Sequence, residues 1–115
     1  MKTTVIITFR MEGMHRWPEA REIFPDVGFL SDLHRHMFHF KMSKLVEHND
    51  RDVEFIRWRR EVQEWLWAEF RDGSDMYLNF ERMSCEDIAT VLLNKFGCEY
   101  VEVFEDGENG ARVEL

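Results

Sequence analysis

Long apolar runs are missing from this sequence of 115 residues. No stretch approaches the roughly 20 apolar residues that a membrane-spanning helix needs, so we expect no membrane partner. The apolar run within residues 1–9 is too short for a secretory signal peptide, and no small-residue cleavage site follows it. The sequence therefore predicts neither a membrane span nor a signal peptide.

Cysteine and basic residues are also scarce. Cys85 and Cys98 do not have a metal-binding spacing, and one pair without a secretory segment predicts reduced thiols in a cytoplasmic protein. Fifteen Lys and Arg residues stand against 23 Asp and Glu residues, which gives a formal net charge of −8. This balance argues against a nucleic-acid partner, because clustered positive charge is what binds a phosphate backbone.

Apolar and aromatic residues are plentiful enough for a folded protein. Hydrophobic residues make up 44% of the chain, and charged residues, at 33%, keep such a chain soluble. A chain of this length buries one core rather than two. We therefore expect a single domain over residues 1–115.

The apolar residues follow two periods along the chain. Alternation with a period of two predicts strands at residues 2–11, 32–47, 98–105 and 112–115. Steps of three and four residues predict amphipathic helices at residues 53–70 and 84–96. Asp52 is the expected N-cap of the first helix, and Asp106-Gly107 and Asn109-Gly110 are tight-turn signals. Residues 12–31, which hold both prolines, are expected to form a long loop.

These elements predict an α+β fold, with a four-stranded antiparallel sheet and two helices on one of its faces. The order along the chain is strand, strand, helix, helix, strand, strand. Such a sheet leaves edge strands that need cover. Pairing of edges between subunits would provide that cover, so we expect a homo-oligomer.

Three histidines stand out as candidate metal ligands. In a strand over residues 32–47, His34 and His36 point to the same face as Phe38 and Phe40. His15 follows the preceding strand, and a hairpin-like return would bring it alongside them. Three imidazoles with an open fourth position are typical of a catalytic zinc site. His-x-His by itself is a weak signal, and the alternative is that these histidines are solvated or bonded to the backbone.

Five segments of the chain resemble segments of one protein family, in the same order and at similar separations. They are Glu12-Gly13-Met14-His15-Arg16-Trp17, Leu33-His34-Arg35-His36, Tyr77-Leu78-Asn79, Ser84-Cys85-Glu86-Asp87-Ile88-Ala89 and Val103-Phe104-Glu105-Asp106. Their counterparts are Phe-Glu-Ala-Ala-His-Arg-Leu, Leu-His-Gly-His, Tyr-Leu-Asn, Pro-Thr-x-Glu-x-x-Ala and Val-x-Glu-Thr. The chain thus resembles the 6-pyruvoyl- and 6-carboxy-tetrahydropterin synthases of the T-fold superfamily.

The resemblance implies a T-fold domain over residues 1–115 that assembles into an oligomeric barrel, a trimer or a hexamer. It implies zinc bound by His15, His34 and His36, and a small-molecule substrate, 7,8-dihydroneopterin triphosphate or a related pterin- or purine-like compound. Glu105 has the position of the residue that anchors the pterin ring in these enzymes. Without the resemblance, Glu105 would be interpreted as a surface residue at the end of a strand.

The chain departs from the family at its proton-transfer groups. Leu30 has the position of the catalytic cysteine, and Ser74 and Asp75 have the positions of an Asp-His pair. The remaining candidates for catalytic acid–base work are Asp32 and Asp75, whose pKa burial would raise. The alternative is that both are turn or capping residues.

Three functions follow as hypotheses. The first is a zinc-dependent lyase of the tetrahydropterin synthase type. The second is a diverged zinc hydrolase or isomerase that uses Asp32 or Asp75 to activate water. The third is a pterin-binding pseudoenzyme that keeps the metal and the pocket, and Leu30 favours the second and third over the first.

Overall fold

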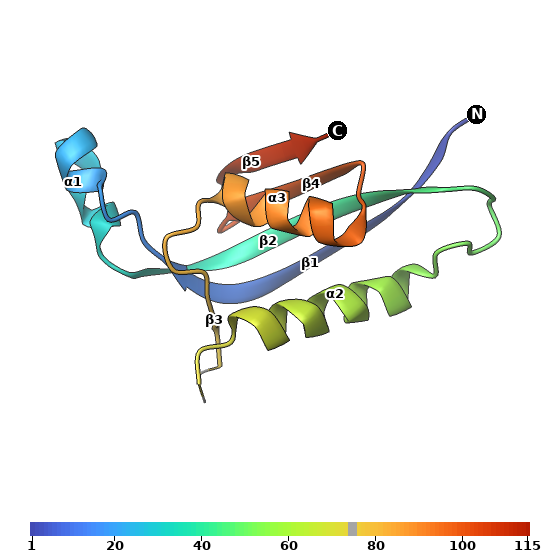
Figure 1. Cartoon of the computed structure of the whole chain (residues 1–115), viewed down its shortest axis with the longest axis horizontal. Coiled ribbons are helices and arrows are strands. Elements are labelled where there is room, and N and C mark those ends of the chain that lie inside the picture. Colours follow the sequence, from blue (N-terminus) through green and yellow to red (C-terminus); the bar gives the residue numbers. More distant parts are fainter. Residues whose placement is uncertain (74–75) are drawn as a thin grey trace.

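Two long antiparallel strands form the centre of the molecule in a computed structural model, which describes residues 1–73 and 76–115 (Figure 1). Strand β1 spans Thr3–His15 and strand β2 spans His34–Val46. They pair along their whole length, from Thr3 opposite Val46 to His15 opposite His34. The first strand is thus four residues longer than the predicted end at residue 11, because the cross-strand pairing with β2 continues through residues 12–15.

The connection between β1 and β2 is more ordered than the loop predicted for residues 12–31. It contains a short helix, α1, at Ala20–Ile23, and a 3-10 helix, η1, at Pro25–Ser31. Pro25 begins η1, where its fixed φ suits a first helical position and its missing N–H costs nothing. Both elements lie at one end of the sheet, beyond the last β1–β2 pair (Figure 1).

The sheet has five strands in the order β3-β1-β2-β4-β5. Strands β4, Tyr100–Glu105, and β5, Asn109–Glu114, continue it antiparallel beyond β2. The fifth strand, β3 at Leu78–Asn79, was not predicted, and it pairs parallel to the end of β1. Two residues are too few to show a period in the sequence, so this strand could not be read from it.

The turn between β4 and β5 uses one of the two predicted signals. Asp106 and Gly107 both have positive φ, 56° and 71°. A type I′ hairpin turn requires positive φ at both of its central residues. Gly110 lies within β5 instead, where a Cβ would stand 2.1 Å from the Val103 carbonyl oxygen. Close approach of two backbones, and not a turn, therefore requires that glycine.

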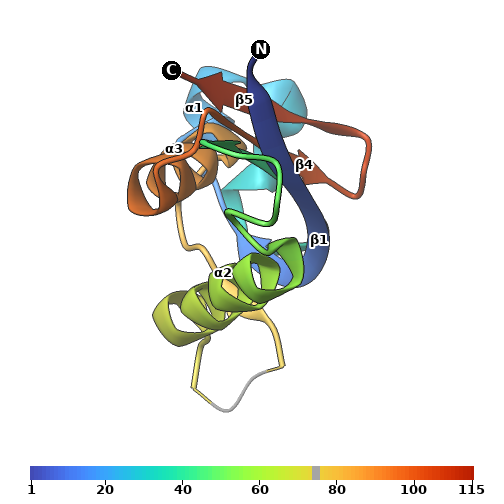
Figure 2. The same ribbon diagram turned by 90° about the vertical axis from the view of Figure 1, so that its right-hand side faces the viewer.

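Two helices cover one face of the sheet, as predicted. Helix α2 spans Phe55–Phe70 and helix α3 spans Cys85–Phe96 (Figures 1 and 2). Ser84 caps α3 in a capping box with Asp87, as the sequence indicated. The N-cap of α2 is Glu54, whose side chain accepts the Arg57 N–H, so the prediction of Asp52 was wrong. Asp52 accepts the Glu47 N–H in the preceding loop.

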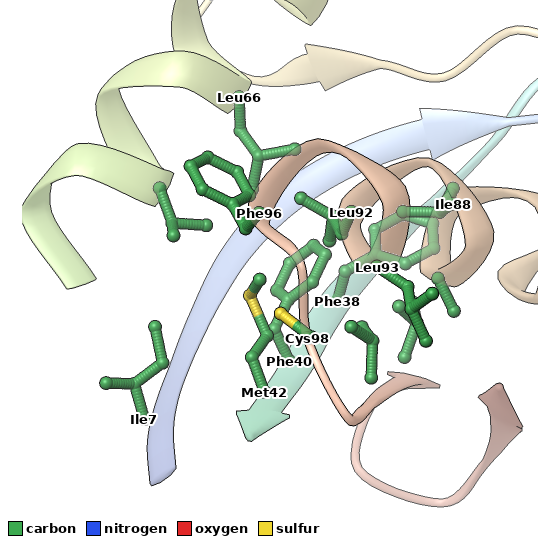
Figure 3. Close-up of a cluster of buried hydrophobic side chains, with 14 of the residues drawn as sticks. Ile7, Phe38, Phe40, Met42, Leu66, Ile88, Leu92, Leu93, Phe96 and Cys98 are labelled. Atoms are coloured by element: carbon green, nitrogen blue, oxygen red, sulfur yellow. The ribbon is translucent and has the colours of Figure 1, made fainter. Parts of the chain in front are cut away.

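The hydrophobic core lies between this face and the two helices (Figure 3). The largest fully buried side chains come from both helices and from β2, β4 and the segments beside them: Phe38, Phe40, Met42, Val62, Leu66, Leu78, Phe80, Ile88, Leu92, Cys98, Val101 and Val103. The α+β prediction with two helices on one face is confirmed. No helix in the described residues is long and apolar enough to cross a membrane.

Within residues 1–73 and 76–115, the opposite face of the sheet and its two outer edges are open. On β1, the residues between the core positions are exposed: Ile6, Thr8 and Arg10. The outer edge of β1 pairs with β3 through Gly13 and Met14, and β5 ends the sheet on the other side. The outer edge of β5 and most of the outer edge of β1 therefore carry backbone groups that pair with no other described strand.

Candidate metal centre

The three predicted histidines lie together at the end of the β1–β2 hairpin. His15 and His34 are directly opposite each other across the two strands, and His36 is two residues along on the same face. The ring centroids are 4.6 Å apart for His15 and His34, 5.3 Å for His15 and His36, and 5.0 Å for His34 and His36. One ring nitrogen of each lies within 4.8 Å of the others, so this group could hold a metal ion.

The Nδ1 atom of each histidine already has an oxygen partner. His15 Nδ1 lies 2.9 Å from the Met83 carbonyl oxygen, and His34 Nδ1 lies 2.8 Å from the Asp32 carbonyl oxygen. His36 Nδ1 lies 2.7 Å from Asp106 Oδ2. Carbonyl and carboxylate oxygens only accept, so each Nδ1 carries the proton and donates it. In the neutral rings, every Nε2 is therefore an unprotonated donor atom for a metal, which is the arrangement found around metal-bound histidines.

Glu105, at the end of β4, adds a carboxylate to this group. Its Oε2 lies 2.8 Å from His15 Nε2, and its Oε1 lies 3.5 Å from His36 Nε2. A lone pair on Nε2 and a carboxylate oxygen repel each other at such distances unless a cation joins them. The cation is either a proton on His15 or a bound metal ion.

The pKa values of the site follow from these contacts. Burial works to lower the pKa of His15, but the hydrogen bonds with Glu105 and the Met83 carbonyl outweigh it, and the pKa is raised. The hydrogen bond with His15 is the main reason why the pKa of Glu105 is lowered. Burial lowers the pKa of His34, which keeps that ring neutral. Without a metal, the proton of the site therefore belongs on His15.

An open cavity of about 380 Å³ adjoins the histidines. Its lining includes His15, His34 and Glu105, together with Trp17, Leu30, Met83 and Cys85. A hydrogen bond of 2.7 Å from the Trp17 N–H to the Leu30 carbonyl holds the two ends of the β1–β2 connection together. The volume lies within the range of small-molecule sites.

Comparisons with known proteins support the same fold. Neither a family model nor a curated protein matches the sequence. Among solved structures, 6-pyruvoyl tetrahydropterin synthase from Caenorhabditis elegans superposes with a TM-score of 0.72 at 13% identity, over 100% of this chain and 96% of that one. An uncharacterized protein from Wolinella succinogenes gives a TM-score of 0.61 at 15% identity, over 99% and 98% of the two chains.

This chain has a tetrahydropterin synthase-like T-fold. The fold resemblance expected from the five sequence segments is thereby confirmed. At these identities the similarity concerns the fold, so the chemistry must be argued from the residues themselves. The T-fold chain carries the three histidines and Glu105 at one site, and Leu30 is part of its cavity wall.

Asp32 does not have the environment that we expected of a general base. Its carboxylate is 70% exposed and pairs with Arg21 at 2.6 Å. That hydrogen bond lowers the pKa of Asp32, whereas burial was expected to raise it. Its main-chain oxygen, and not its carboxylate, faces His34. Asp75, like Ser74, lies outside the described residues.

Two residues that the structure places at the site were not predicted from the sequence to be part of it. Cys85 begins α3 and lines the cavity, with Sγ 3.8 Å from Glu105 Oε2. Burial and then the charge of Glu105 raise the pKa of its thiol to about 12. Asp106 appeared in the sequence as a turn residue, and its contact with His36 depends on the register of β2 against β4. The sequence signal that places Cys85 is the Ser84 N-cap, because the residue after an N-cap is the first residue of the helix.

Proposed function

We propose that this protein is a zinc-dependent pterin-binding protein of the tetrahydropterin synthase type, with 7,8-dihydroneopterin triphosphate or a related pterin- or purine-like compound as its ligand. One observation carries the proposal: three histidines each place a ring nitrogen within 4.8 Å of the others, their Nδ1 atoms already face oxygen atoms, and Glu105 lines the cavity beside them. Ligation by three neutral imidazoles with a position left open is typical of catalytic zinc.

The donor set fits the ion. Two of the Nε2 atoms, those of His15 and His36, are buried, and the side-chain group that each of them faces is the Glu105 carboxylate, at 2.8 Å and 3.5 Å. A cation satisfies both atoms and also compensates the charge of Glu105. Zinc held by His15, His34 and His36 would polarise a carbonyl or hydroxyl oxygen of the ligand as a Lewis acid.

Glu105 is suited to hold the ring of the ligand. Its lowered pKa keeps the carboxylate ionised, and its two oxygens can accept a pair of hydrogen bonds from a ring N–H and an exocyclic amine. The cavity lining also includes Trp17, Leu30 and Met83, whose apolar groups suit an aromatic ring. The role of Glu105 as a substrate anchor is therefore part of the proposal.

The groups available for proton transfer are the weaker part of the site, and they favour ligand binding over turnover. Leu30 has no titratable group, and a thiol with a pKa of about 12, such as Cys85, stays protonated at neutral pH. General acid–base groups contribute about 10²–10⁴-fold each to a reaction. A pterin-binding pseudoenzyme with little or no lyase activity fits these residues. The hydrolase or isomerase hypothesis loses the support of Asp32, whose carboxylate is paired with Arg21.

Oligomerisation is a further part of the proposed function. The open edges of β1 and β5 can pair with strands of neighbouring copies. Assembly as a trimer or a hexamer would close the sheets into a barrel, which is what the T-fold resemblance implies. The pterin site would then lie at or near a subunit boundary.

Calorimetry with neopterin and the zinc-loaded protein tests the ligand. We expect saturable binding that Glu105→Ala weakens at least tenfold, because the paired acceptors are lost. Glu102→Ala is the matched control: it lies on the same strand, but its side chain pairs with Arg112. Zinc-loaded protein that does not bind neopterin, or binds it equally well after Glu105→Ala, would contradict the pterin assignment. Conversion of dihydroneopterin triphosphate at a rate typical of enzymes would contradict the pseudoenzyme alternative.

A further inference from the structure

Asp106 contacts both His36 and the backbone next to it. Its Oδ2 accepts the His36 Nδ1–H at 2.7 Å, and its Oδ1 accepts the Met37 N–H at 2.9 Å. The Asp106 N–H in turn donates to the Met37 carbonyl oxygen at 2.8 Å. Three hydrogen bonds therefore join this one residue to two consecutive residues of β2.

The β4–β5 turn explains why the carboxylate reaches His36. Asp106 directly follows Glu105, which pairs with Phe38 of β2 at the end of β4. The left-handed backbone of Asp106, with φ of 56°, is one that aspartate tolerates better than most residues. The same residue thus ends the strand and carries its side chain back toward β2.

His36 differs from the other two histidines in the kind of partner that it has. The Nδ1 atoms of His15 and His34 face main-chain carbonyl oxygens, whereas that of His36 faces a carboxylate. The charge of Arg35 contributes to the lowered pKa of Asp106, after the hydrogen bonds with Met37 and His36. The Arg35 side chain donates its hydrogen bond to Glu12, at 2.6 Å. A charged acceptor strengthens the hydrogen bond and increases the electron density on the opposite ring nitrogen.

We propose that Asp106 is a positioning residue of the metal centre, which fixes His36 as the Nδ1–H tautomer and makes its Nε2 a stronger metal donor. This inference rests on the proposed zinc site. The alternative is that Asp106 only holds the β4–β5 turn against β2. An amide at this position distinguishes the two roles, because it can support the turn but cannot accept the His36 N–H in the same way.

Asp106→Asn separates these roles. The amide oxygen can still accept the Met37 N–H, and asparagine also tolerates a positive φ, so the turn keeps its support. The NH₂ group then faces His36 Nδ1 as a donor, which favours the tautomer with the ring proton on Nε2. That proton occupies the atom that would bind the metal. We expect the zinc affinity, measured by competition with a chromophoric chelator, to fall by about 10–100-fold. Nitrogen-15 NMR of the metal-free protein should show that the His36 tautomer has changed.

Asp52→Asn is the matched control, because Asp52 also accepts a backbone N–H and lies 3.5 Å from a histidine, His48, in the β2–α2 loop. It should leave zinc affinity unchanged. Asp106→Gly, which suits the turn but removes the carboxylate, should weaken zinc binding even if Asp106→Asn does not fold. Wild-type zinc affinity in both Asp106 variants would overturn this inference and leave the proposed function standing. Wild-type protein that binds no zinc would overturn both.

Discussion

Gly13 provides a test of how tightly the core supports the metal centre. A Cβ at this position of β1 would lie 3.0 Å from two ring atoms of Phe38 and 3.1 Å from a ring atom of Phe80. Both rings are fully buried, so neither can move into solvent. Phe38 also packs against two of the histidines, with ring centroids 5.2 Å from His15 and 5.7 Å from His36. Gly13→Ala should therefore disturb both the core and the site.

The expected size follows from the packing. Adding a methyl group to a filled core costs about 1–3 kcal/mol of unfolding free energy. For a chain of this length, 1 kcal/mol corresponds to roughly 4 °C in Tm, so we expect a fall of about 4–12 °C by calorimetry. Zinc affinity should fall as well, because the rings of His15 and His36 must shift with Phe38.

A double-mutant cycle decides whether Phe38 is the cause. Phe38→Leu removes the ring atoms that the new methyl group meets, so the double variant should be more stable than the sum of the single effects by about 0.5–3 kcal/mol. Gly28→Ala is the control, because its Cβ would meet the Cγ of the exposed Arg21 side chain, which can move away. Additive effects of Gly13→Ala and Phe38→Leu would show that the Phe38 ring is not the cause, and a Gly13→Ala variant as stable as wild type would show that the core has room for the methyl group.

Two further predictions concern the cavity thiol and assembly. With a pKa of about 12, roughly one Cys85 thiol in 10⁴ is ionised at pH 8, so native protein should react with iodoacetamide far more slowly than a free thiol, and faster after Glu105→Gln removes a nearby negative charge. Rapid alkylation of Cys85 in the native protein would contradict this. Light scattering at micromolar concentration should give the mass of a trimer or hexamer, and a monomer mass would count against assembly through the β1 and β5 edges.

Much of the fold could be predicted because its signals are local. The alternation in β2 gave the common face of His34 and His36, and the Ser84 capping box and Gly97 gave the ends of α3. The α+β class followed from the order of these elements. The helix-period pattern likewise identified α2, although its first residue was placed two positions early.

The rest depended on which strands meet and in what register. The pairing that extends β1 to His15 comes from β2, which lies beyond the connecting segment, so the sequence of β1 could not reveal it. The choice between the Asp106-Gly107 and Asn109-Gly110 signals likewise depended on the β4–β5 register. The environment of Asp32 depended on Arg21, which α1 brings toward it. Side-chain partners across such distances leave no periodic trace in a single sequence.

Zinc content is the direct test of the proposed metal centre at His15, His34 and His36. Protein purified without a histidine tag should contain one zinc ion per chain, and the His34→Ala/His36→Ala double variant should contain almost none while it keeps its folded circular dichroism spectrum. The variant removes two of the three candidate ligand imidazoles, and a single imidazole binds zinc too weakly to retain it through purification. Near-zero zinc in the wild-type protein after incubation with the ion, or full zinc content in the double variant, would rule out a zinc site at these three histidines.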